Sequence, residues 1–124
     1  DVFCGPSMVF TNVRNPRSAI NRKQEYKTTY VEKGVSFGAN STIICGVNIG
    51  EHAFIGAGSL VNKDVKPFSI VAGVPAKQIG WMSIYGERID LPLQGEGKWE
   101  CPHTGIYYNL NGNVLYSQST KSEN

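Results

Sequence analysis

Residues 31–66 repeat one pattern of apolar and small residues every six positions. The first position of each block is aliphatic or aromatic: Val31, Phe37, Ile43, Ile49, Ile55 and Val61. The fifth position is small or aliphatic: Val35, Ser41, Val47, Ala53, Ser59 and Val65. A period of six fits neither an α-helix nor an ordinary alternating strand, and it is typical of a parallel β-helix.

Each block predicts a short strand and a corner, with its first residue directed into a narrow core. Three blocks close one coil, so residues 31–48 and 49–66 are expected to stack about 4.8 Å apart, the spacing of paired strands. Glycines, together with Asn40 and Asp64, occupy corner positions where a positive φ is tolerated. The alternative is an antiparallel sandwich with regularly spaced turns, which six successive matches disfavour.

The register continues on the N-terminal side but is interrupted by a polar insertion. Residues 2–13 fit the pattern, whereas residues 14–30 do not and begin near an Asn-Pro turn signal. We therefore predict a β-helix domain over residues 1–80, with residues 14–30 as a protruding loop. Because the register is already in place at Phe3, we expect further coils upstream of the first residue.

Beyond the β-helix the pattern changes, and we predict a small β appendage over residues 81–116. Residues 107–116 read as a hairpin with Asn111 and Gly112 at its turn, a strong hairpin signal. The polar residues 117–124 are expected to be a disordered tail.

Composition limits the classes of partner. The chain has 124 residues and a formal charge of +2, too small to favour binding to nucleic acid or to an anionic membrane. It has no apolar run near 18 residues and no recognisable signal peptide, so we expect a cytoplasmic protein. The three cysteines are widely spaced and odd in number, which favours reduced thiols.

The sequence Cys-Pro-His-Thr-Gly at residues 101–105 resembles half of a zinc knuckle. A structural zinc site needs four ligands, usually as two close pairs, and the second pair is missing around Gly86. We therefore expect no bound metal.

Two segments resemble the hexapeptide-repeat acyltransferases: VFTNVRNPRS at residues 9–18 and IGAGSLVNKDVKPFSIVAGVPAKQI at residues 55–79. The resemblance implies an all-β fold, a left-handed parallel β-helix with a protruding loop and a small C-terminal β-hairpin appendage. With GWMSIYGERIDLPL and CPHTG included, the chain looks most like bacterial UDP-2-acetamido-3-amino-2,3-dideoxyglucuronate N-acetyltransferases. Those enzymes prepare sugars for surface polysaccharide such as lipopolysaccharide O-antigen.

A track of small residues is the predicted cofactor site. Residues 18 apart stack, which places Gly38 beneath Gly56 and Ala39 beneath Ala57. The resemblance implies that the pantetheine arm of acetyl-CoA lies along this track. It also implies that the nucleotide end of coenzyme A lies near the segment after the last coil: Gly73, Pro75, Ala76 and Lys77. Simple corner geometry for the glycines, and an ordinary solvated role for Lys77, are the alternatives.

The loop is the predicted acceptor site. It carries five basic residues against the single acid Glu25, a bias that suits a phosphate or carboxylate ligand or, alternatively, a merely solvated loop. The resemblance implies a UDP-linked amino sugar as acceptor, with Arg14, Arg17 and Thr11 as candidate contacts.

The catalytic prediction rests on Asn12. Many relatives of this class use a histidine base, but the only histidines here are His52, expected to face solvent at a corner, and His103 in the appendage. An amine acceptor needs no strong base, because a neutral amine held in line attacks the thioester directly. Asn12 would orient the amine or the thioester carbonyl; its alternative role is that of a turn residue.

We therefore expect an acetyl-CoA-dependent sugar N-acetyltransferase that acts as a homotrimer with sites between neighbouring subunits. Alternatives are an O-acetyltransferase of another sugar and a non-catalytic β-solenoid that serves binding or assembly. Metal-dependent hydration, as in γ-type carbonic anhydrases, needs three histidine ligands, and the chain has two.

Overall fold

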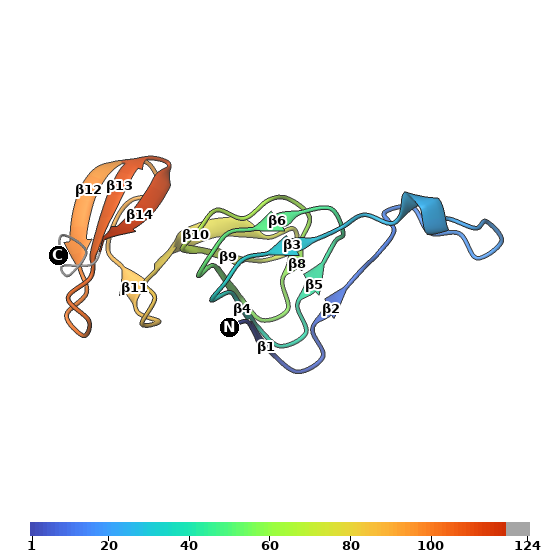
Figure 1. Cartoon of the computed structure of the whole chain (residues 1–124), viewed down its shortest axis with the longest axis horizontal. Helices are drawn as coiled ribbons and strands as arrows, with labels where there is room; N and C mark the ends of the chain where they lie inside the picture. Colours follow the sequence, from blue (N-terminus) through green and yellow to red (C-terminus); the bar gives the residue numbers. More distant parts are fainter. Residues whose placement is uncertain (119–124) are drawn as a thin grey trace.

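The computed structural model describes residues 1–118, which form short β-strands and one 3-10 helix (Figure 1). Residues 119–124, most of the predicted tail, lie outside the described residues. Residues 117 and 118 belong to the last strand, β14 (Val114–Gln118). No helix of residues 1–118 is long and apolar enough to cross a membrane.

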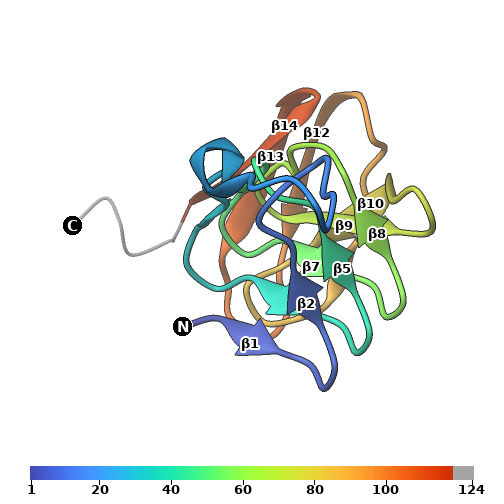
Figure 2. The ribbon, with the colours of Figure 1, turned by 90° about the vertical axis from the view of Figure 1, so that its right-hand side faces the viewer.

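Three parallel sheets form the faces of a β-helix, which Figure 2 shows nearly end-on. Face 1 contains β1 (Phe3–Cys4), β4 (Ser36–Phe37), β7 (Phe54–Ile55) and β9 (Ser69–Ala72). Face 2 contains β2 (Val9–Phe10), β5 (Thr42–Ile43) and β8 (Leu60–Val61). Face 3 contains β3 (Tyr30–Val31) and β6 (Asn48–Ile49). We call the bend from face 1 to face 2 the first corner, that from face 2 to face 3 the second, and that from face 3 back to face 1 the third.

The strand register confirms the predicted coil of eighteen residues. Phe37 pairs with Ile55 on face 1, and Ile43 pairs with Val61 on face 2. The pairing of Cys4 with Phe37 spans a longer stretch of chain because the loop is inserted between the two coils.

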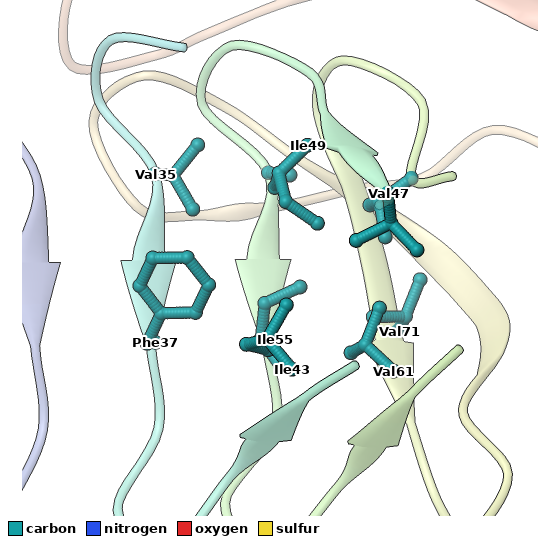
Figure 3. Packing of buried hydrophobic residues seen from close by; sticks show 10 residues of the cluster. Val35, Phe37, Ile43, Val47, Ile49, Ile55, Val61 and Val71 are labelled. Carbon is teal, nitrogen blue, oxygen red and sulfur yellow. The ribbon is translucent and has the colours of Figure 1, made fainter. Parts of the chain in front are cut away.

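The core occupies the interior of the three faces, as Figure 3 shows. Eleven of the twelve predicted inward positions are buried, and the twelfth, Val31, is half-buried. Each fully buried Val, Ile or Phe side chain contributes about 1.5 to 3 kcal/mol. The core is therefore narrow, with two inward residues on each side of a coil, and its stability depends on the unbroken repeat.

The corners require left-handed backbone at the fourth position of successive blocks. The φ angle lies between 57° and 87° at five of them, listed in chain order as Gly34, Asn40, Gly46, His52 and Gly58. The expectation of positive φ at Asp64 was wrong. Its carboxylate instead accepts a hydrogen bond from the Asn48 N–H at 2.9 Å, so Asp64 stabilises the corner through its side chain.

The loop between β2 and β3 leaves the β-helix and contains the 3-10 helix η1 (Lys23–Glu25). Figure 1 shows this loop at one end of the long axis and the C-terminal strands at the other. The predicted protrusion of the loop is confirmed.

The C-terminal region extends face 1 and then forms a separate sheet. Strands β10 (Lys77–Met82) and β11 (Arg88–Ile89) continue face 1 with antiparallel pairing. Strands β12 (Gly95–Glu100), β13 (Tyr107–Gly112) and β14 form a three-stranded antiparallel sheet. The predicted hairpin is β13–β14, but its turn lies one residue later than expected, because Asn111 already pairs with Val114.

A second core joins this sheet to the end of the β-helix. Its centre is Trp81, which is fully buried and donates a hydrogen bond to the Pro92 carbonyl at 2.8 Å. Phe68, at the third corner, packs edge-on against Tyr108 of β13 with ring centroids 5.6 Å apart. The appendage is thus attached through aromatic packing as well as through the chain.

Candidate active site

Stacked glycines define the first corner. Gly5, Gly38 and Gly56 each follow directly after a strand of face 1. A Cβ atom on Gly38 would stand 2.5 Å from the Ala57 nitrogen, and one on Gly5 would stand 2.7 Å from the Ala39 nitrogen. Because both contacts are with backbone, the coils stack at this corner only with glycine.

At the other two corners, the first coil has a side chain in the position of these glycines, although Gly50 takes that position at the third corner of the next coil. Thr11 follows β2, and its Oγ1 accepts a hydrogen bond from the Cys45 N–H of the next coil at 3.0 Å. Glu32 follows β3, and its Oε1 accepts a hydrogen bond from the Glu51 N–H at 3.0 Å. Each side chain satisfies a backbone donor that the parallel ladder leaves unpaired.

Glycine provides no such acceptor at the first corner. The equivalent donors are the N–H groups of Ala39 and Ala57, and neither has a hydrogen-bond partner among residues 1–118. Ala39 is half-buried and Ala57 is exposed. The predicted track of small residues is therefore a column of free backbone donors, suited to a ligand that carries amide carbonyls.

The turn between β9 and β10 lies at the end of this column. The Gly73 carbonyl accepts from the Leu60 N–H at 3.0 Å, and the Ala76 N–H donates to the Leu60 carbonyl at 2.8 Å. The Gly73 N–H donates to Ser59 Oγ at 3.3 Å. The last predicted cofactor residues, including the exposed Pro75 and Lys77, therefore continue the track formed by the glycine and alanine pairs.

A groove of about 350 Å³ runs between the last corner of the β-helix and β10. Ala76 and Lys77 line it, as do Lys63 and Lys66, which the sequence reasoning did not single out. Asp64 is the only acid on its lining. Three lysines against one carboxylate make this groove suitable for phosphate groups.

The loop is attached to the second corner at its base. The Lys27 N–H donates to the Asn12 carbonyl at 3.1 Å, and the Gly46 N–H donates to Thr29 Oγ1 at 3.2 Å. Together with Thr11, these bonds fix both ends of the loop against the corner at residues 45–46.

The four predicted acceptor and catalytic residues do not form one cluster. Asn12 and Arg17 line a common cleft of about 500 Å³ formed by the loop. Arg14 instead lies over the second corner, with its Nε 3.7 Å from where a Cβ on Gly46 would stand. Thr11 directs its oxygen at the backbone, so the structure gives it a structural contact.

Face 2 separates the two parts of the predicted site. The glycine column lies at the first corner and the loop with Asn12 at the second, on either side of β2, β5 and β8 (Figure 2). A single copy of the chain therefore does not bring Asn12 to the predicted cofactor track.

The two histidines lie away from both corners. His52 is at the third corner, half-buried, with its ring stacked on Phe68 at 5.5 Å between centroids, so it faces solvent only in part. Burial lowers the pKa of His52; Glu51 opposes this shift and Lys33 adds to it. His103 stacks on Tyr85 in the C-terminal region, with centroids 4.3 Å apart.

The half knuckle at residues 101–105 is a closed turn. Cys101 is buried, and burial raises the pKa of its thiol. Hydrogen bonds from the Thr104 hydroxyl and from the backbone of His103 and Thr104 outweigh burial, so the pKa lies below its ordinary value. Within residues 1–118, no group of three or more His, Cys, Asp or Glu side chains is arranged to hold a metal ion.

Comparison with known proteins identifies the repeat. The family described as bacterial transferase hexapeptide (six repeats) matches residues 28–63. Residues 28–63 of the β-helix are thus similar to the repeat of that family. The six-residue pattern, the eighteen-residue coil and the left-handed β-helix implied by the resemblance are the fold of these hexapeptide-repeat transferases.

Similar proteins are acetyltransferases. The chain is 44% identical over 59 residues to dTDP-3-amino-3,6-dideoxy-α-D-galactopyranose 3-N-acetyltransferase of Aneurinibacillus thermoaerophilus, covering 48% of this chain and 31% of that protein. It is 44% identical over 85 residues to chloramphenicol acetyltransferase of Morganella morganii, covering 68% and 40%. A hexapeptide-repeat acetyltransferase of Vibrio cholerae solved with acetyl-CoA superposes with a TM-score of 0.58 and 32% identity, covering 66% and 46%. The chain thus spans less than half the length of each.

Proposed function

We propose that the complete protein transfers the acetyl group of acetyl-CoA to the amino group of a nucleotide-linked amino sugar. The sequence resemblance favours a UDP-linked 3-amino uronic acid as the acceptor. This sugar would be a precursor of lipopolysaccharide O-antigen, and the reaction would take place in the cytoplasm. The observation that carries the proposal is the column of free N–H donors at the first corner, which ends beside a groove containing three lysines.

The cofactor half of the proposal follows from that column. The N–H groups of Ala39 and Ala57 match the amide carbonyls of a pantetheine arm, and the glycines let the arm approach the backbone. Lys63, Lys66 and Lys77 would then neutralise the phosphates of coenzyme A. The similarity to a structure containing acetyl-CoA supports this assignment.

The acceptor half rests on the absence of a base. Within residues 1–118, neither His52 nor His103 lies at the first corner or in the loop. A neutral amine attacks the thioester carbon directly, the carbon–sulfur bond then breaks, and the amine proton passes to water while the thiolate of coenzyme A leaves. Asn12 would orient the amine or donate to the developing oxyanion.

The catalytic unit would be a homotrimer. Since face 2 separates Asn12 from the cofactor track within one chain, a second copy would bring its loop to the track of the first. A cyclic trimer forms three such identical sites.

Exchange of Asn12 for alanine tests the assignment. Asn12→Ala is expected to lower kcat/KM for the amino sugar at least tenfold, about 1.4 kcal/mol of transition-state stabilisation, while acetyl-CoA still binds. Asn109→Ala, on the separate C-terminal sheet, is the matched control and should retain full activity. Unchanged kcat/KM in a correctly folded Asn12→Ala protein would remove Asn12 from the mechanism.

A further inference from the structure

The loop forms a cleft without help from any other element. All of its lining residues lie between Asn12 and Tyr26, and its volume is about 500 Å³. The loop is fixed at its base by the Asn12–Lys27 backbone bond and by Thr29. A ligand could therefore bind there in each copy of the chain independently of the acetyl donor.

Cations dominate the wall of the cleft. Arg17, Arg22 and Lys23 line it, and Glu25, the only acid in the loop, pairs with Arg22 Nη1 at 2.8 Å. The Nε atom of Arg22 is buried and has no hydrogen-bond partner. Glu25 engages only Nη1 of Arg22, and a guanidinium carries further N–H donors that form strong hydrogen bonds to phosphate oxygens.

Apolar surface lies beside these charges. Tyr26 is 53% exposed and Ile20 is 52% exposed, and both line the cleft. An exposed aromatic ring next to cations suits a ligand that combines a flat heterocyclic base with phosphates, because bases stack on aromatic side chains. A simple inorganic anion would leave Tyr26 and Ile20 without a role.

We propose that this cleft anchors the nucleoside diphosphate part of the acceptor, with Arg17, Arg22 and Lys23 on the diphosphate and Tyr26 against the base. The proposal rests on the proposed function for the nature of the acceptor, a sugar linked to a nucleotide. It separates recognition from chemistry: the loop holds the nucleotide, and the sugar extends past Asn12 at the mouth of the loop. Arg14 lies outside the cleft and has no part in this anchor.

Calorimetric titration of the full-length protein without acetyl-CoA tests the anchor. UDP, inorganic pyrophosphate and uridine are the probes. Arg22→Gln and Arg22→Lys should each weaken UDP and pyrophosphate binding at least tenfold, since lysine lacks the planar fork, and should change uridine binding little.

Tyr26→Leu should weaken UDP and uridine binding at least fivefold, and Tyr26→Phe should restore both. Lys98→Gln, a change of one charge at the opposite end of the molecule, should bind UDP as the unchanged protein does.

The outcomes distinguish the proposal that the loop cleft binds the nucleotide from the proposal that the protein is an acetyltransferase. Should Arg22→Gln in the protruding loop unfold the protein, Lys23→Gln, for which a threefold or greater loss of UDP affinity is expected, replaces it. UDP affinity within twofold of normal in both Arg22→Gln and Tyr26→Leu overturns the proposal, as does an equal loss in Lys98→Gln. Acetyl transfer to a nucleotide sugar by a protein that does not bind UDP also overturns it and leaves the proposed function intact. UDP binding that depends on Arg22 and Tyr26, without any acetyl transfer, supports the anchor and refutes the enzyme.

Discussion

At the scale of single residues, the contrast between Gly38 and Thr11 explains why one corner of the β-helix differs from the others. Both residues follow directly after a strand, but Thr11 provides an oxygen for the donor above it and Gly38 provides nothing. The free donors at Ala39 and Ala57 are a consequence of that missing side chain. The candidate cofactor track thus results from the absence of a side-chain acceptor at the glycine positions.

Gly38→Ser should damage both the fold and the cofactor track. Its Cβ would meet the Ala57 nitrogen at 2.5 Å, so neighbouring coils must separate, at a cost of about 1 to 3 kcal/mol of unfolding free energy. Acetyl-CoA affinity should fall at least tenfold.

The control is Gly86→Ala, where φ is 101° and no atom lies within 4 Å of the new Cβ. It should lose a similar stability, about 1 to 2 kcal/mol, and no affinity. Urea unfolding and equilibrium binding measure the two effects, and equal loss of affinity in both variants would contradict the track.

His52 predicts a dependence of stability on pH. Burial holds its pKa below 6.5 in the folded protein, so the unfolded chain takes up a proton first as the pH falls. The stabilising contribution is complete above about pH 6.5 and is lost below it, as the pH approaches the lowered pKa. In His52→Asn, which tolerates the positive φ, the loss of unfolding free energy between pH 7.5 and 5.5 should be smaller. Identical losses in the two proteins, measured by urea unfolding, would count against this role.

At the scale of elements, the loop combines a fixed base with a basic cleft. Two threonines and one backbone bond hold its ends at the second corner, and Lys23 of η1 lines the cleft. Thr11, expected as a substrate contact, is part of this base. Sequence reasoning could locate the loop because the register fails there, but it could not show which oxygen meets which N–H of a coil eighteen or more residues away.

Thr11→Val tests the structural role of this threonine. Removal of its oxygen leaves the Cys45 N–H without an acceptor, which costs about 1 to 3 kcal/mol for a buried donor. Thr11→Ser keeps the oxygen and should be nearly as stable as the natural protein. Hydrogen exchange at the Cys45 amide should accelerate in the valine variant alone. A stable Thr11→Val protein that loses only acceptor affinity would restore the substrate role.

The repeat was predictable because each inward position is marked in the sequence by an apolar or small residue at a fixed spacing. The first and fifth residues of each six-residue block point inward, and this pattern can be read from the sequence alone. The coil and the stacking of Gly38 on Gly56 follow from the spacing, and the loop is located where the spacing fails. The C-terminal sheet was less predictable. Strand β12 contains Gly95 and Gly97, which do not favour a strand, and its sheet is fixed by packing in the cluster that includes Trp81. The lysine groove required β10 to fold back beside Lys63 and Lys66, a contact that no local pattern encodes.

At the scale of the whole molecule, the two halves of the candidate site lie at different corners. The cofactor track and the loop are separated by face 2, and the appendage occupies the far end of the long axis (Figure 1). In a monomer, the proposed binding places of the two ligands are therefore separate. An oligomer in which one copy's loop reaches another copy's first corner unites them.

Sedimentation of the full-length protein tests this arrangement. We expect a trimer at concentrations where the enzyme is active, and mixing Asn12→Ala with Gly38→Ser subunits should restore part of the activity that each variant lacks. The gain arises because a mixed trimer contains sites with an intact Asn12 on one subunit and an intact track on its neighbour. A monomer with full turnover, or no gain on mixing, would place both halves in one chain.

Release of the coenzyme A thiol by the full-length protein tests the central claim most directly. The protein is offered acetyl-CoA with UDP-3-amino-glucuronate, with a UDP-4-amino sugar and with a nucleotide sugar that carries only hydroxyl groups. The account predicts turnover with an amino sugar and none with the hydroxyl sugar, since within residues 1–118 no histidine stands at the first or the second corner to deprotonate an alcohol. Turnover with the hydroxyl sugar would contradict N-acetylation, and a trimeric protein that releases no thiol with any acceptor would be a binding solenoid instead of an enzyme.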